Sequence, residues 1–157
     1  MIKRNDGHKS KIGIFGVGLD LYWPQFPGLL EELTGYLKEF EAGVRKFNPN
    51  VVSAGIVDNP RKAVAAGDLF KRENVDIVFC DATTYVTAAS VLPVAQRCCA
   101  PVILVGLQPS DRMDFKKATT YGLLVNASIT PMPEFCNSFE RAGIPLTSVL
   151  KPLEEAE

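Results

Sequence analysis

The sequence predicts an α/β domain in which a parallel β-sheet is covered by helices on both faces. Along most of the 157 residues, short apolar segments alternate with longer segments whose apolar residues recur at three- and four-residue steps. Short apolar runs are typical of buried strands, and the longer spacing is typical of helices with one apolar face. Strands that alternate with helices form right-handed βαβ units, which build parallel sheets.

Two strand–helix pairs account for the first half of the chain. The strands are expected over residues 11–18 and 51–58, where the sequence is apolar and ends in glycine or aspartate. The helix after the first strand is expected over residues 24–47, because its leucines fall on one face. The helix after the second strand is expected to run to Arg72, with Asn59 as the N-cap that accepts a bond from the first turn.

The next strand–helix–strand unit is more apolar. Strands are expected over residues 75–82 and 101–107, and a buried helix rich in small residues is expected over residues 84–99. The continuous apolar run of the second of these strands is typical of a central parallel strand that is covered on both faces.

The pattern weakens after Gln108, where a polar loop begins. Residues 121–129 are compatible with either a strand or a helix. A short helix is expected over residues 133–142, because Gly143 follows in the C′ position that favours glycine. Residues 145–150 are expected to form the last strand.

These elements predict a three-layer sandwich, flavodoxin-like or Rossmann-like, with about five parallel strands in the order 2-1-3-4-5. The domain is expected to cover residues 11–150, between a disordered polar extension (1–10) and an acidic tail (151–157). Ligands of such folds bind beyond the carboxyl ends of the strands, near the point where the strand order reverses.

Composition excludes several classes of function. The formal net charge of −1 lacks the basic excess of a nucleic-acid-binding protein. No apolar run is long enough for a membrane span, and we identify no signal peptide. The four cysteines form no C-x-x-C pair, and the single histidine, His8, precedes the fold, so we predict no metal site. Reduced cysteines indicate a cytoplasmic protein.

The first loop does not fit a dinucleotide. Gly16 and Gly18 give G-x-G, but Leu21 occupies the position of the third glycine. Asp58 follows Gly18 by about 40 residues, twice the usual spacing of the ribose-binding acid. Trp23 and its neighbours are also too bulky for a phosphate loop.

The same loop suits a small sugar better. Aromatic faces pack on the apolar faces of sugar rings, and the side chains of Asp20, Tyr22 and Gln25 can bond hydroxyl groups. Trp23 has a second interpretation, since a single tryptophan more often packs against the end of the core.

Two further strand ends carry polar residues. Thr83 and Thr84 follow the third strand and are expected to cap the next helix, while Tyr85 is expected to project near the sheet end. Gln108 ends the fourth strand, where it either binds a ligand or satisfies backbone groups of the loop.

Four segments occur in the order and spacing of a known family. They are GVGLDLYWPQF (16–26), DATTYV (81–86), VILVGLQ (102–108) and NASITPMPEFCNSFERAGIP (126–145). Over Lys11 to Leu150, the chain resembles the N-terminal domain of L-arabinose isomerase and L-fucose isomerase-like proteins.

The resemblance implies part of a cytosolic aldose–ketose isomerase that uses a divalent metal, usually Mn²⁺, and assembles as a homo-oligomer. The family's metal ligands, two glutamates and two histidines, belong to C-terminal catalytic domains that this chain lacks. We therefore predict no catalytic residue here, and expect the chain to form a wall of the sugar pocket and subunit contacts. The pocket residues so implied are Leu19, Asp20, Leu21, Tyr22, Tyr85 and Gln108, and we add Trp23 because it lies in the same loop.

Two positions depart from the family pattern. Many members have a histidine just after the fourth strand, where this chain has Gln108, and Gln-His where it has Leu19-Asp20. Both differences argue against arabinose itself as the ligand.

An alternative is a stand-alone flavodoxin-like binding or regulatory module, or an engineered structural domain. Asp20, Asp58, Asp81 and Lys151 offer the acids and the lysine of a response regulator. The aromatic residues of the first loop would crowd that site.

Overall fold

The computed structural model describes residues 10–110, 112–114, 116–145 and 147–152. Most of the extension expected over residues 1–10 and of the tail expected over residues 151–157 therefore lies outside the described residues.

The predicted parallel sheet and its strand order are confirmed. All four pairings are parallel, and the strands lie in the order β2-β1-β3-β4-β5. Their bounds are β1 Ile12–Val17, β2 Val51–Val57, β3 Ile77–Asp81, β4 Val102–Gln108 and β5 Thr147–Pro152.

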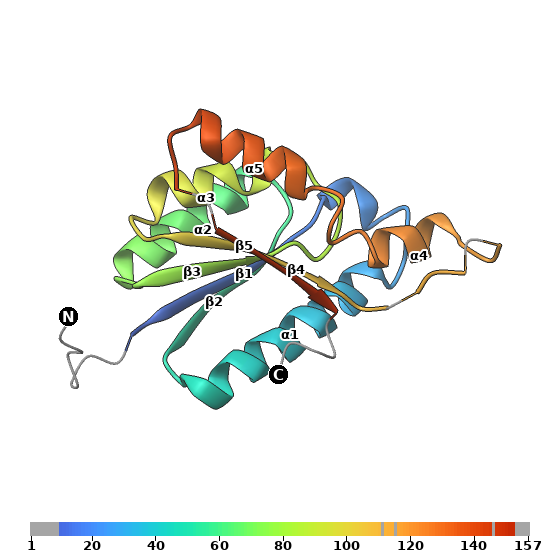
Figure 1. Cartoon of the computed structure of the whole chain (residues 1–157), viewed down its shortest axis with the longest axis horizontal. Coiled ribbons are helices and arrows are strands. Elements are labelled where there is room, and N and C mark those ends of the chain that lie inside the picture. The colour runs from blue at the N-terminus through green and yellow to red at the C-terminus, as the bar shows by residue number, and fades with distance from the viewer. Residues whose placement is uncertain (1–9, 111, 115, 146, 153–157) are drawn as a thin grey trace.

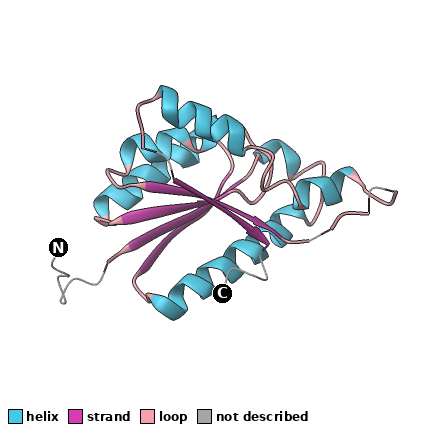
Figure 2. Cartoon of the chain, viewed as in Figure 1, coloured by secondary structure: helices cyan, strands magenta, loops and turns pink. Residues whose placement is uncertain are grey.

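Helices cover both faces of the sheet, as Figure 1 shows. On one face lies α1 (Leu29–Phe47), and on the other lie α2 (Pro60–Arg72), α3 (Leu92–Arg97) and α5 (Met132–Arg141). The three layers are also clear in Figure 2. The short helix α4 (Thr120–Val125) packs against α1.

Two apolar clusters stabilise these layers. The larger one fills the space between the sheet and the α2, α3 and α5 layer, and contains the fully buried rings of Phe15, Phe70, Phe135 and Phe139. The smaller one joins α1 to α4 through Leu29, Leu33 and Val125, with several partly buried aromatic residues around them. The smaller cluster lies next to the loop that follows β1, since Tyr22 and Trp23 belong to it.

The first helix begins later than the sequence predicts. Gly28 has a φ of 89°, in the left-handed region, and α1 begins only at Leu29. The segment before it forms a turn of 3-10 helix over Asp20–Tyr22. The loop after β1 is thus structured before α1 starts, and it holds most of the predicted pocket residues.

The helix predicted over residues 84–99 is wrong in its first half. The segment contains a 3-10 turn at Ala88–Ser90 and then α3. Neither threonine caps a helix: the Thr83 hydroxyl donates to the Val17 carbonyl, and the Thr84 hydroxyl donates to the Leu124 carbonyl at 2.7 Å. Proline is tolerated in the first turn of a helix, and α3 begins at Leu92, so that Pro93 lies in its first turn.

The C-terminal region follows local capping rules. The ambiguous segment 121–129 begins with the helix α4, whose N-cap Thr119 accepts a bond from the Gly122 amide at 3.1 Å. Gly143 ends α5 with a φ of 68°, and the Ile144 amide bonds to the Phe139 carbonyl at 2.9 Å. The predicted C′ role of Gly143 is confirmed.

Candidate functional site

The reversal of strand order lies between β1 and β3. The chain leaves β1 towards β2 on one side, and leaves β3 towards β4 on the other. In parallel sheets of this kind, ligands bind beside the loops at such a reversal. Those loops contain Asp20, Leu21, Tyr22 and Tyr85, so most of the predicted pocket residues lie there.

Tyr22 and Tyr85 are close enough to interact electrostatically across these loops. Burial, and then the Tyr85 phenol, raises the pKa of Tyr22 above its usual value. Tyr22 is half-buried, Asp20 is exposed, and the exposed fractions of Leu21 and Tyr85 are 64% and 37%. The two loops therefore present aromatic and polar side chains at one end of the sheet.

Three of the predicted residues are placed differently. Leu19 packs against the larger core cluster. The ring of Trp23 lies against Gly18, where an added Cβ would approach within 2.7 Å of ring carbons. Gln108 ends β4, so β3 separates it from β1 and from the loop that carries Tyr22. Trp23 thus has the packing role that was its second interpretation.

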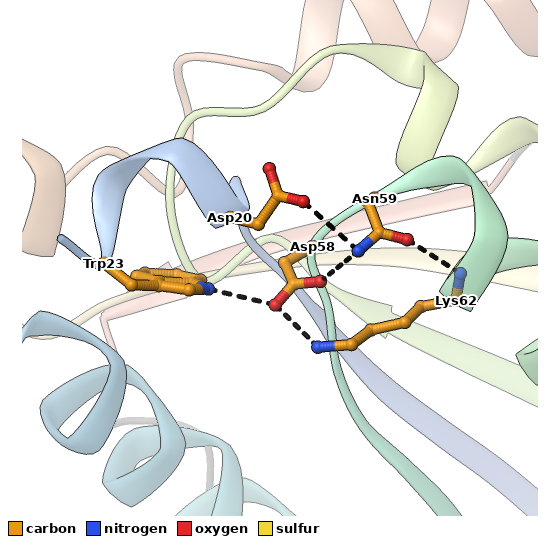
Figure 3. Close-up of polar contacts among 5 residues, drawn as sticks. All are labelled: Asp20, Trp23, Asp58, Asn59 and Lys62. Carbon is orange, nitrogen blue, oxygen red and sulfur yellow. Dashed lines mark hydrogen bonds and ion pairs between the residues drawn. The ribbon is translucent and has the colours of Figure 1, made fainter.

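The Trp23 ring is held by Asp58, in an arrangement that Figure 3 shows. The Asp58 carboxylate is 2% exposed and accepts three bonds: from Trp23 Nε1 at 2.9 Å, Lys62 Nζ at 2.7 Å and Asn59 Nδ2 at 3.0 Å. Asn59 Nδ2 also lies 3.3 Å from Asp20 Oδ2, and Asn59 Oδ1 accepts a bond from the Lys62 amide. The predicted N-cap role of Asn59 is therefore confirmed.

This Asp58 network fastens the loop after β1 to the turn between β2 and α2. Backbone bonds run in parallel, from the Gly18 amide to Val57 and from the Asp20 amide to Asp58. The sequence suggests Asp58 as a nucleotide-binding acid or as one acid of a response regulator, and neither interpretation includes this role. The predicted order places the end of β2 beside the end of β1 and so brings Asp58 near the loop of Trp23, but no local pattern identifies the hydrogen-bond partners of this acid.

Asp81 is a second buried acid, at the end of β3, and its surroundings differ. Its exposed fraction is 3%, and Oδ1 has no hydrogen-bond partner. Burial raises the pKa of Asp81 to about 8, so the protonated form prevails at neutral pH. A carboxylic acid in this state can both donate and accept a hydrogen bond.

A second set of polar contacts involves α1 and α4. Glu32 accepts bonds from the Tyr36 hydroxyl at 3.0 Å and from the Tyr121 hydroxyl at 2.6 Å. The bond to Glu32 raises the pKa of Tyr121 to about 12. These contacts fix α4 beside the first turns of α1, next to the cluster that contains Tyr22.

The side chains present do not fit a metal centre. Among the described residues, no three His, Cys, Asp or Glu side chains lie together in a way that could hold a metal ion. The Mn²⁺ implied by the resemblance therefore finds no ligand set in this part of the chain. For the same reason, Asp20, Asp58 and Asp81 do not form the acidic cluster expected of a response regulator.

Within the described residues, no helix combines the length and apolarity required to cross a membrane. No protein-family model matches the chain, and no curated protein is significantly similar to it. The resemblance to the sugar isomerases therefore stays a prediction from the residues of the sequence.

Proposed function

We propose that this chain is the N-terminal domain of a sugar isomerase-like, cytoplasmic protein, in which it forms one wall of a sugar pocket and part of the subunit contacts. The observation that carries the proposal is that Tyr22 and Tyr85, on the loops that follow β1 and β3, lie close enough to interact electrostatically. Two half-exposed phenols beside the exposed carboxylate of Asp20 offer apolar faces and hydrogen-bonding groups together. That combination suits the faces and hydroxyls of a sugar.

The proposed domain does not catalyse isomerisation by itself. Moving a hydrogen between two carbons of an aldose requires an acid–base group and polarisation of the carbonyl oxygen. The described residues contain no cluster of metal ligands. We assign those groups to C-terminal catalytic domains, and expect a homo-oligomer to bring a neighbouring subunit against the loops that carry Tyr22 and Tyr85.

Titration of the full chain with L-arabinose, L-fucose and L-arabinitol, followed by amide NMR shifts, tests this proposal. We expect weak, saturable binding with shifts centred on Asp20–Tyr22 and Tyr85, because an open half-pocket leaves much of a ligand in water. Tyr22→Ala should weaken that binding by about a few fold to tenfold, the range expected for one aromatic contact.

Phe47→Ala is the matched control, because Phe47 is an exposed aromatic residue (81%) at the other end of α1. It should leave sugar binding unchanged. Shifts that are absent with all three compounds, or that centre on Phe47, would contradict the proposed function.

A further inference from the structure

The fold leaves one carboxyl oxygen of Asp81 without a partner at the carboxyl end of the central strand β3. This oxygen, Oδ1, is buried. Burial of an unpaired polar oxygen opposes folding, and most buried polar atoms in proteins have a partner. A molecule that reached Oδ1 would therefore supply a bond that the chain itself does not.

Apolar side chains lie around Gly16, the residue of β1 that pairs with Asp81 on the same face of the sheet. Asp81 pairs with Gly16 of β1 and with Val105 of β4. A Cβ added at Gly16 would meet methyl carbons of Ile56, Thr83 and Leu37 at 2.8 to 3.2 Å. The titratable neighbour Cys80 points to the opposite face of the strand. Burial, and to a smaller extent the Asp81 carboxylate, raises the pKa of the Cys80 thiol. None of these groups offers Asp81 a strong donor.

A short irregular segment follows Asp81. Between β3 and the 3-10 turn at Ala88, the chain forms neither helix nor strand. Hydroxyl-to-carbonyl bonds from Thr83 to Val17 and from Thr84 to Leu124 hold this segment in place. Tyr85 lies on the same segment, so a shift of these few residues would bring Asp81 within reach of a ligand held beside Tyr22 and Tyr85.

We propose that Asp81 is the buried acid of a ligand subsite at the β1–β3 junction, where its carboxyl group exchanges hydrogen bonds with a hydroxyl group of a neutral polyhydroxy ligand. This inference rests on the proposed function and deepens it, because it names the group that anchors the sugar. A protonated carboxyl both donates and accepts, as a hydroxyl does. Burial, and not a nearby charge, raises the pKa of Asp81. The site therefore offers no positive charge that would favour an anionic ligand.

The direct test follows the ¹³Cγ resonance of Asp81 in the full chain as a function of pH, with and without saturating L-arabinitol. We expect the midpoint to rise when the polyol binds, because the ligand prefers the protonated acid. A rise of about one pH unit corresponds to tenfold weaker binding to the ionised form. The ¹³Cγ resonance of Asp68, which pairs with Arg97 at the surface, is the internal control and should not move.

Asp81→Asn provides the matched variant. Its amide keeps the size and both bonding capacities of the acid but does not titrate. Binding of L-arabinitol to the wild type should weaken about tenfold between about pH 6 and about pH 9, whereas binding to Asp81→Asn should stay constant.

Three results would overturn the inference. Polyol-induced shifts at Tyr22 and Tyr85 without any change in the Asp81 midpoint would overturn the subsite while leaving the proposed function intact. Absence of shifts at either tyrosine would overturn both. A midpoint that falls with N-methyl-D-glucamine and does not respond to L-arabinitol would overturn the neutral ligand, because a cation favours the ionised acid.

Discussion

Asp58 follows β2 and Asp81 ends β3, so both acids lie at the carboxyl end of the sheet. Their exposed fractions are 2% and 3%. Asp58 accepts bonds from a tryptophan, a lysine and an asparagine, while Oδ1 of Asp81 accepts none. Equal burial therefore gives two different groups: one carboxylate that holds the loop after β1, and one acid that the fold leaves unused. The two acids therefore differ in the hydrogen-bond donors around them and not in burial.

The difference follows from where the two strands lie. β2 is an edge strand, and Asp58 leads directly into α2, whose first turn supplies Lys62. β3 is central, so Asp81 is flanked by Gly16 and Val105, which offer no side-chain donor. A strand end at an edge can reach the next helix for partners, whereas one in the centre depends on its neighbouring strands.

The largest expected effect that separates the two acids is the pH dependence of stability. The folded pKa of Asp81 is about 8 and its ordinary value is 3.8, so the folded chain binds the proton more tightly. The free energy of unfolding should therefore fall as pH rises from about 4 to about 8, by on the order of 5 kcal/mol from this group.

Asp81→Asn removes this contribution, since an amide carries no titrating proton. Urea unfolding at several pH values should show the wild type losing stability relative to Asp81→Asn across that window. Parallel pH profiles for the two proteins would contradict the assignment of a neutral Asp81.

The next effect is the loss of the Asp58 network. Asp58→Ala leaves Trp23 Nε1 without its acceptor and removes the partner of Lys62, so we expect a loss of about 3 kcal/mol in the free energy of unfolding. Trp23 is the single tryptophan of the sequence, and its emission reports both unfolding and the local change.

Asp68→Ala is the matched control, because Asp68 pairs with Arg97 at about half exposure. An exposed ion pair stabilises by less than about 1 kcal/mol. If Asp58→Ala costs no more than Asp68→Ala, the Asp58 network does not hold the loop.

The smallest effect tests the contact between Trp23 and Gly18. A methyl group at Gly18 would meet ring carbons at 2.7 Å, so Gly18→Ala should displace the ring from Asp58 and destabilise the fold by about 1–3 kcal/mol. Gly35→Ala in α1 meets nothing within 4 Å and should stabilise by about 0.5–1 kcal/mol. Thermal unfolding of the two variants compares them, and equal shifts of the same sign would contradict this packing role.

Local rules and periodicity predicted most of the fold. The strand order, the N-cap at Asn59 and the C′ glycine at Gly143 each depend on residues close in sequence or on a general topological rule. The long helix expected after Thr84 was wrong because the Thr84 hydroxyl bonds to Leu124, far along the chain. A contact of that kind leaves no trace in local spacing.

The candidate site was predictable only in outline. The rule for parallel sheets indicated which loops would meet, and Tyr22 and Tyr85 lie there. The inward orientation of Trp23 and the isolation of Asp81 depend on which atoms surround each side chain. Those surroundings combine residues from several strands, so the sequence pattern could not separate Asp58 from Asp81.

The pairing of β4 with β5 has a consequence for how the protein is made. About forty residues separate the end of β4 from the start of β5, and at typical elongation rates their synthesis takes a few seconds. During that interval, strands β1 to β4 are present on the nascent chain while the apolar edge of β4 has no partner. Open edges of this kind pair with other chains, so the yield of folded protein should depend on translation speed and on chaperones that shield β4.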